Sequence, residues 1–594
     1  MPETDLRKGT AVSRPSTFTE LLLSRAAELG DRTALVFLRQ TREGQVPQPL
    51  SYRRLDRAAR GIAAWIQAND GVGQRVLVLQ AEGRAFVESF VGCLYAGAVA
   101  VPAPPPDGGQ HFMTRCMGIV RDAEVGLVLT DSDHAADVAR RLADTGRGEI
   151  RCLATDLLPD LGGGAWTMSD TDGRDLAFLQ YTSGSTSEPK GVMVAHRNLL
   201  ANQAAISRAM RTDSSSVIGG WLPFHHDMGL VGHLLHPLWL GGTGVMMSPG
   251  AFVRRPVSWL RMISEYGVTT GGGPNFGYEQ CVERITDEQL EGLDLSRWRT
   301  AVNGSEPVNA QTLRRFADRF ARVGLRREAL YPCYGMAETT LLVTGGSPGR
   351  APTEFTADAA ALADHRLEPP EPGAEARTLV SSGWPQNAEL RIVDPESREV
   401  LPDGSVGEVW VRGDSDCRGY WNRPVESGRA FRATTADGDP GYLRTGDLGV
   451  LRDGELYVTG RLKEIVILAG RNLYPQDIEG AVRRVSLSFG IGAAFGVDTG
   501  REQVVLVQEV RHAGTPGLDL GGLASTAQRC ILREFDIPAG NVLLVRPGTV
   551  RRTTSGKLQR GEMRRLLLEG AIKPMHQVLH PELRELIGSG ASSW

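Results

Sequence analysis

One short segment of the chain carries the residue types that bind phosphate groups. An apolar run at 176–179 leads into the loop Thr182–Gly191, whose first half is crowded with small and hydroxyl-bearing residues: Thr182, Ser183, Gly184, Ser185 and Thr186. Small residues let backbone N–H groups approach an anion closely, hydroxyl groups add donors, and Lys190 adds a positive charge. The segment therefore predicts a site for a triphosphate or pyrophosphate, in preference to a merely solvated loop.

The loop does not follow the Walker spacing of P-loop NTPases. Counting from Gly184, Pro189 stands where the second glycine would be, and Gly191 follows Lys190 in place of Ser or Thr. That hydroxyl is the group that would bind Mg²⁺ in such a protein. The spacing disfavours a P-loop NTPase.

Further glycine-rich and polar segments follow the loop in a fixed order. They occupy residues 221–229, 271–281, 303–308, 331–340, 442–449, 460–475 and 551–560. Together with the phosphate loop they resemble the adenylate-forming superfamily, which includes acyl-CoA synthetases, luciferases and peptide-synthetase adenylation domains. The resemblance implies that a carboxylate attacks the α-phosphorus of ATP and that pyrophosphate leaves. Positioning and charge stabilisation should dominate such a reaction.

The resemblance implies ATP and Mg²⁺ as cofactors and assigns residues to them. Asp447 matches the carboxylate that binds the ribose hydroxyls, and Arg461 matches a residue that helps to hold ribose or phosphate. Glu338 matches the Mg²⁺ ligand beside the phosphates. The remaining nucleotide contacts that the resemblance implies, most of them in the adenine slot, are Gly304, Ser305, Glu306, Tyr334, Gly335, Met336 and Thr339.

Lys557 is the residue that we expect to contribute most to adenylation. By resemblance, its ammonium group lies between the attacking carboxylate and the α-phosphate. Lys463 matches the hinge about which the small domain turns after adenylation. His226 matches a residue at the boundary between the acyl pocket and the adenylate, where we expect it to gate or position the acid.

Residues of the acyl pocket are placed only by their position in the motifs. Met228, Gly229 and Phe276 are expected to line an acyl tunnel, with Tyr334 beside them, although core packing favours the same residue types. His225, His233 and His236 are expected to be structural histidines, because no cysteine or carboxylate spacing typical of a metal site accompanies them.

Within the superfamily, the sequences of three motifs are similar to those of the fatty acyl-AMP ligases. They stand at 221–232, 271–281 and 331–343, and a Pro- and Ala-rich insert at about 345–377 follows the last of them. The resemblance implies a fatty acid substrate and transfer to the phosphopantetheine thiol of a separate acyl carrier protein. Lys190 is more typical of CoA ligases, so an acyl-CoA synthetase is the alternative. A non-catalytic adenylate-binding protein is a second alternative.

The order of elements predicts an α/β fold of two domains. Short apolar runs such as 75–79 and 126–130 suit buried parallel strands separated by crossover helices. We expect a large N-terminal domain over 1–460, with parallel or mixed sheets, flanking helices and a small β-subdomain. A small mobile α+β domain is expected over 461–574, and a tail, 575–594, made of a helix with a frayed end. The insert alone suggests a surface loop.

Composition excludes several classes of protein. The net charge of −4 gives no reason to expect a nucleic-acid partner. The seven cysteines include no C-x-x-C pair, which favours a reducing compartment. No secretory signal or membrane span is predicted, because the uncharged stretch 89–106 is too short and ends in prolines. We expect a cytoplasmic monomer.

Overall fold

A nine-stranded mixed sheet forms the centre of the large domain in the computed structural model. The structure describes residues 15–41, 44–81, 83–105, 109–158, 165–182, 189–468, 471–511, 517–535, 537, 540–553 and 556–590. In spatial order the strands are β17 (Trp384–Pro385), β14 (Leu342–Gly345), β13 (Leu330–Gly335), β12 (Thr300–Asn303), β11 (Thr270–Gly273), β9 (Val217–Gly220), β10 (Thr243–Met247), β1 (Thr33–Gln40) and β2 (Gln45–Ser51). The strands from β13 to β1 pair in parallel, which confirms the α/β prediction.

A six-stranded sheet lies beside the first. Its order is β6 (Arg151–Ala154), β5 (Leu127–Thr130), β3 (Arg75–Val78), β4 (Val99–Pro102), β7 (Leu176–Thr182) and β8 (Lys190–Ala195). The pairs from β6 to β7 are parallel, whereas β7 and β8 pair antiparallel, so that the two strands bracketing the phosphate loop are neighbours. The described part of the uncharged stretch, 89–105, includes most of the buried helix α3 and then the buried strand β4, as predicted.

Helices cover both sheets. The α-helices of the large domain are α1 (Phe18–Leu29), α2 (Tyr52–Ala68), α3 (Arg84–Ala96), α4 (Gly109–Asp122), α5 (Ser132–Asp144), α6 (His196–Met210), α7 (His236–Leu240), α8 (Pro249–Arg254), α9 (Val257–Tyr266), α10 (Asn275–Arg284), α11 (Ala310–Phe320), α12 (Ala359–Ala363) and α13 (Pro424–Phe431). The π-helix η3 (Met228–Leu235) precedes α7, and the 3₁₀ turns are η2 (Thr155–Leu157), η4 (Glu288–Leu290), η5 (Ala321–Val323), η6 (Arg327–Ala329) and η7 (Ala337–Thr339). None of the helices in the described ranges is both long and apolar enough to cross a membrane.

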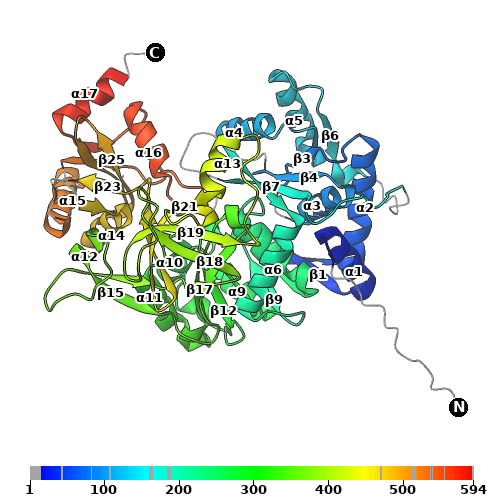
Figure 1. Cartoon of the computed structure of the whole chain (residues 1–594), viewed down its shortest axis with the longest axis horizontal. Helices are drawn as coiled ribbons and strands as arrows, with labels where there is room; N and C mark the ends of the chain where they lie inside the picture. The colour runs from blue at the N-terminus through cyan, green and yellow to red at the C-terminus, as the bar shows by residue number, and fades with distance from the viewer. Residues whose placement is uncertain are drawn as a thin grey trace.

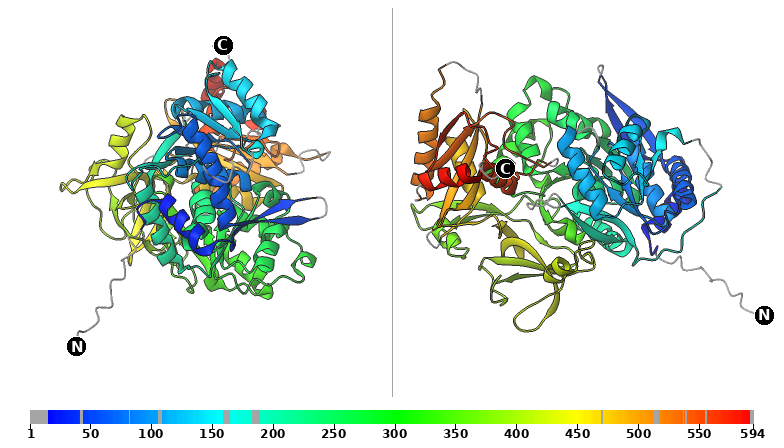
Figure 2. Two further views of the ribbon diagram at one scale, coloured as in Figure 1. Left: turned by 90° about the vertical axis from the view of Figure 1, so that its right-hand side faces the viewer. Right: turned by 90° about the horizontal axis from the view of Figure 1, so that it is seen from above.

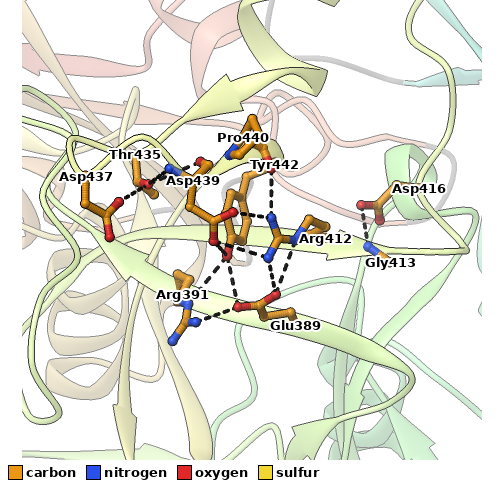
Figure 3. Close-up of polar contacts among 10 residues, drawn as sticks. All are labelled: Glu389, Arg391, Arg412, Gly413, Asp416, Thr435, Asp437, Asp439, Pro440 and Tyr442. Atoms are coloured by element: carbon orange, nitrogen blue, oxygen red, sulfur yellow. Dashed lines mark hydrogen bonds and ion pairs between the residues drawn. The ribbon is translucent and has the colours of Figure 1, made fainter.

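A smaller antiparallel sheet forms the β-subdomain. It contains β18 (Ala388–Val393), β19 (Gly407–Gly413), β21 (Pro440–Arg452) and β20 (Ala433–Thr434), with β22 (Glu455–Arg461) paired to β21. Figure 3 shows the polar network that links three of these strands: Arg412 reaches Glu389 and Asp439 at 2.6 Å each, and the Tyr442 hydroxyl oxygen lies 2.9 Å from an oxygen of each carboxylate. Because Arg412 bridges two carboxylates from different segments, the network serves to hold the strands together.

The small C-terminal domain is a four-stranded sheet with helices. Its strands are β25 (Phe489–Asp498), β26 (Glu502–Val510), β27 (Asn541–Val545) and β28 (His576–Val578), its helices are α14 (Pro475–Val485), α15 (Leu520–Phe535), α16 (Arg560–Leu568) and α17 (Pro581–Gly590), and the hairpin β23 (Val466–Leu468) and β24 (Arg471–Leu473) precedes them. In Figure 1 and in the right-hand view of Figure 2, the orange and red elements of this domain lie at one end of the molecule, away from the blue N-terminal elements. The expectation for residues 575–594 was incomplete, because β28 pairs with β27 before the helix begins.

The insert at 345–377 is not a plain surface loop. Strand β15 (Glu354–Asp358) pairs antiparallel with β16 (Ala376–Val380), and α12 follows β15. The few apolar residues of the insert gather in one cluster with Leu448, Tyr457 and Tyr474, and its own members there are Phe355, Ala357, Leu362 and Leu367, with Leu379 of β16 just after it. The prediction was wrong because it rested on the small number of apolar residues in the segment. That number does not reveal that these residues pack together in one cluster.

His196 connects α1 to α6 and makes the fold sensitive to acid. Thr17 caps α1 by accepting from Glu20 N–H, and the next free helix donor, Phe18 N–H, donates to Nδ1 of His196 at 3.2 Å. His196 must be neutral to accept this bond. Its burial lowers its pKa from 6.5 to about 4, although Asp175 and Glu20 partly oppose the shift.

Replacing His196 should remove part of the acid sensitivity. The unfolded chain binds a proton at His196 below pH 6.5 and the folded chain does so only near pH 4, so the contribution of this residue to stability decreases as the pH falls through that window. At pH 5 the loss is about 2 kcal/mol. The amide oxygen of His196→Gln can still accept from Phe18 N–H. When the pH is lowered from 7.5 to 5, the unfolding free energy of this variant should decrease by about 2 kcal/mol less than that of the parent protein. Urea denaturation at both pH values measures this, and parallel losses in the two proteins would refute it.

Candidate active site

A cleft of about 1330 Å³ lies between the large and small domains and contains most of the residues that the sequence singled out. Elements of both domains line it. The predicted site residues that face it are Lys190, His226, Phe276, Ser305, Glu306, Tyr334, Gly335, Met336, Glu338, Asp447, Arg461, Lys463 and Lys557. Residues more than 300 positions apart in the sequence thus meet in one space.

Two antiparallel strands present a charged pair to the cleft. Asp447 of β21 lies opposite Arg461 of β22 in the strand register, and Arg461 Nε donates to Asp447 Oδ1 at 2.9 Å. The other oxygen, Oδ2, accepts from the Tyr334 hydroxyl at 2.8 Å. Burial, with the carboxylate of Asp447 beside it, raises the pKa of Tyr334 and keeps its hydroxyl protonated. The arrangement fixes a carboxylate beside an aromatic ring, which suits a diol next to a flat base.

Glu338 occupies a separate buried position on the same cleft. It lies in η7 and is 9% exposed, and the Tyr420 hydroxyl donates to its Oε1 at 2.8 Å. Burial raises the pKa of Glu338, and the bond from Tyr420 partly offsets that rise. The ammonium group of Lys190 lies 5.3 Å from the centre of the Tyr420 ring. Tyr420, which no motif had singled out, therefore connects the loop lysine to the acidic residue.

A second acidic group, Asp227, lies near Lys557. His226 Nδ1 is 2.6 Å from Asp227 Oδ1. Burial opposes the ionisation of Asp227, but the charges of His226 and Lys557 outweigh it and lower its pKa to about 2. Burial lowers the pKa of Lys557, whereas the neighbouring Asp227 carboxylate favours its charged form. Asp227 belongs to the 221–229 segment that the sequence analysis identified, but the sequence did not indicate its role.

The loop that carries Lys557 rests on the large domain. Gly556 has φ +87°, and a Cβ atom added there would lie 2.1 Å from Cε1 of Phe276. The backbone N–H of Phe276 in turn donates to Glu306 Oε1 at 2.6 Å. Burial raises the pKa of Glu306 to about 7, against the effects of that bond and of Lys557. Glu306, Phe276 and Gly556 thus form a contact that sets how closely Lys557 approaches the cleft.

A small apolar cavity adjoins the cleft. It has a volume of about 50 Å³ and shares Ser305, Cys333, Tyr334 and Gly335 with the cleft. Of the residues expected in the acyl pocket, Met228 lines this cavity, and Gly304 lines it as well.

Two of the expected acyl-pocket residues and one nucleotide contact lie elsewhere. Phe276 faces the cleft. Gly229 packs so closely that a Cβ atom there would lie 2.1 Å from the carbonyl oxygen of Pro223. The hydroxyl of Thr339 donates to the carbonyl oxygen of Met336 at 2.9 Å.

The phosphate loop itself lies largely outside the described residues. Ser183, Gly184, Ser185 and Thr186 belong to that part, and Thr182 is described only as the last residue of β7. Phosphate binding by these residues stays a prediction. The hinge role of Lys463 also stays a prediction, although its position just after β22 places it at the junction of the two domains.

The histidines near η3 are buried. His236 is held by Gln203 Oε1 at 2.5 Å and by Thr212 Oγ1 at 2.8 Å, and burial lowers its pKa to about 3. His233 is 3% exposed, and burial lowers its pKa to about 4. Within the described ranges, no group of three or more His, Cys, Asp or Glu residues could hold a metal ion.

Ion pairs hold the small domain over the cleft. Arg483 of α14 contacts Glu279 at 3.0 Å and Glu283 at 2.6 Å, both on α10 of the large domain. Arg377 of the insert contacts Asp477 of α14 at 3.1 Å, and its guanidinium carbon lies 4.8 Å from the centre of the Tyr474 ring. Both contacts fix the orientation in which Lys557 faces the cleft.

Comparison with known proteins gives a consistent relationship. The family model of AMP-binding enzymes matches residues 22–421. The chain is 41% identical to the medium-chain-fatty-acid–[acyl-carrier-protein] ligase JamA of Moorena producens, over 94% of this chain and 97% of that protein. Two crystal structures from Legionella pneumophila are similar to it. A fatty acid AMP ligase has a TM-score of 0.75 at 37% identity, covering 97% and 99% of the two chains. A fatty acyl-adenylate ligase in complex with acyl adenylate and pyrophosphate has a TM-score of 0.74 at 36% identity, covering 95% and 98%.

The chain belongs to the AMP-binding enzyme family. Within that family it is a member of the fatty acyl-AMP ligases.

Proposed function

We propose that the enzyme activates a fatty acid as its acyl-AMP, releases pyrophosphate, and transfers the acyl group to the phosphopantetheine thiol of a separate acyl carrier protein. The observation that carries this proposal is the convergence of Lys557, the Asp447–Arg461 pair and Glu338 on one cleft that adjoins an apolar cavity. A cationic group, a ribose-binding carboxylate and an acidic group for a metal–phosphate complex are what acyl adenylation needs.

Each residue has a role that its position supports. Lys557 neutralises the charge that accumulates between the carboxylate and the α-phosphate, and Asp227 and the small-domain contacts keep it in place. Asp447 accepts from the ribose hydroxyls while Arg461 and Tyr334 hold its oxygens. The fatty acyl chain leaves the cleft beside Met228 and enters the apolar cavity.

A single buried carboxylate is compatible with Mg²⁺ bound together with ATP. Mg²⁺ usually takes one or two protein carboxylates and fills its other positions with phosphate oxygens and water. Glu338 would hold it, and the ion would then neutralise charge on the departing pyrophosphate. The hydrogen bond from the Tyr420 hydroxyl orients the carboxylate of Glu338.

The adenylation step can be tested without knowledge of the natural acid. ATP–pyrophosphate exchange should depend on an added fatty acid, and acyl-AMP should appear when ATP and the acid are supplied together. The same mixture with a phosphopantetheinylated carrier protein should give the carrier thioester. If no medium- or long-chain acid supported exchange, the proposal would fail.

Carrier protein and CoA can be distinguished as acceptors. We propose that Arg377 restrains the small domain through Asp477 and so disfavours transfer to CoA. Arg377→Ala should raise CoA thioester formation by about fivefold or more, and adenylation should change little. Arg366→Ala is the matched control, because Arg366 lies in the same insert but pairs with Asp364 and Glu368. Equal CoA yields from the two variants would remove this role from the insert. Deleting 350–375 is less informative, since it would expose the cluster around Tyr457.

A further inference from the structure

The small cavity beside Met228 has buried polar side chains in a largely non-polar wall. Much of its lining is aliphatic or sulfur-bearing, including Ile206, Met210, Ile218, Val302, Leu341 and Leu342. Polar side chains also line it, namely His233, His236, Thr270, Ser305 and Tyr334. Of these, His233 and Thr270 are 3% and 5% exposed, respectively. If the enzyme acts as proposed above, the distal part of the acyl chain occupies this cavity.

One ring nitrogen of His233, Nδ1, is buried and lacks a hydrogen-bond partner among the described residues. His236, on the same wall, is different, because Gln203 and Thr212 hold both of its ring nitrogens. A buried polar group without a partner is costly, and its presence needs an explanation.

The local backbone directs His233 to this position. In a π-helix, residues five apart are hydrogen-bonded neighbours, so η3 places His233 one turn beyond Met228 on the same side. Gly220 makes room for the ring, since a Cβ atom there would lie 2.3 Å from Nδ1. Thr270 of β11 pairs with Ile218 of β9, two residues from Gly220, and lines the same cavity.

The ring is neutral in this environment, because burial keeps its pKa well below neutrality. A neutral imidazole offers one donor and one acceptor, and the threonine hydroxyl can do either. A charged group would find no counter-ion among these lining residues, whereas a hydroxyl or ketone oxygen could bond to both side chains. A saturated chain would leave Nδ1 of the imidazole unpartnered.

We propose that the cavity selects a fatty acid that carries a hydroxyl or oxo group on the distal part of its chain, recognised by His233 and Thr270. This inference rests on the proposed adenylation of a fatty acid. It concerns only which acid the enzyme prefers. A site built to hydrogen-bond an oxygen discriminates against the analogue without it by tenfold or much more.

A panel of acids of equal chain length tests the proposal. Octanoate and decanoate would be compared with their hydroxy and oxo derivatives, substituted at successive carbons from C5 to the end, by ATP–pyrophosphate exchange. The wild-type enzyme should prefer at least one substituted acid by about tenfold or more in kcat/KM. Equal or better use of the saturated acids would overturn the proposal. If none of the acids supported exchange, the proposed function would be overturned as well, so the two failures are distinguishable.

Variants identify the residue responsible. His233→Leu should reduce the preference for the substituted acid to within about twofold while saturated acids are still activated. His233→Gln, which keeps a hydrogen-bonding group, should retain part of the preference and covers the case in which the leucine variant folds poorly. Met210→Leu, in the same cavity, should change both kinds of acid alike and leave their ratio intact. An unchanged ratio in both His233 variants would overturn the assignment.

Discussion

Lys557→Ala should lower the rate of acyl-AMP formation by about 100- to 1,000-fold. The side chain lies near Asp227 in the cleft, and its charge is the one best placed to offset the approach of two anions. Because ATP also contacts the large domain, its dissociation constant should change by no more than about threefold. Pyrophosphate release and ATP binding, measured on the same preparation, separate the two effects.

Two controls sharpen this result. Lys573→Ala removes an exposed lysine from the same small domain and should leave adenylation unchanged. Synthetic acyl-AMP supplied to the Lys557 variant should still donate its acyl group to the carrier protein, because the adenylation step has been bypassed. A variant that released pyrophosphate at the normal rate, or that had lost ATP binding altogether, would contradict the role assigned to Lys557.

Gly556→Ala should reduce adenylation by about 10- to 100-fold although it removes no functional group. A methyl group at this position would lie 2.1 Å from the ring of Phe276, and the backbone φ of +87° already disfavours any other residue. The loop would have to move away from the large domain, and Lys557 would move with it. Single-turnover formation of acyl-AMP is the measurement.

A variant at a second glycine distinguishes the steric effect of the Phe276 ring from the effect of backbone strain. Gly548→Ala, in the same domain, meets nothing within 4 Å of the added methyl group but has nearly the same φ, +83°. It should therefore lose some stability without a comparable loss of rate. Phe276→Ala combined with Gly556→Ala should recover part of the rate, because it removes the ring that the methyl group strikes. Equal rates in the two single alanine variants would show that contact with Phe276 does not matter.

Much of the fold could be predicted because buried parallel strands have a simple pattern. The runs at β3 and β5 were found from their apolar continuity and their turn-forming neighbours. The insert was misjudged because its folding depends on Leu448, Tyr457 and Tyr474, which are distant in sequence. Strand β28 was missed for a similar reason, since three residues gain a partner only when β27 is beside them.

The candidate site likewise contains some residues that the sequence could predict and others that it could not. Lys557, Asp447 and Glu338 stand in recognisable motifs, and their meeting in one cleft agrees with the resemblance. Tyr420 and Arg483 stand in none of the motifs that mark the nucleotide, and their contacts with Glu338 and Glu279 arise from tertiary packing alone. The unpartnered Nδ1 of His233 could not be predicted either, because His236, three residues later, has partners for both ring nitrogens and differs only in its neighbours.

The cluster around the insert has a consequence for how the protein melts. Its apolar residues come from the insert, from β21 and β22 of the large domain, and, through Tyr474, from the segment that leads into α14. Separating the two domains would expose surface belonging to both, so neither can lose its structure without cost to the other. The insert thus couples the domains thermodynamically, and heating should produce one cooperative transition where two loosely tethered domains would give two.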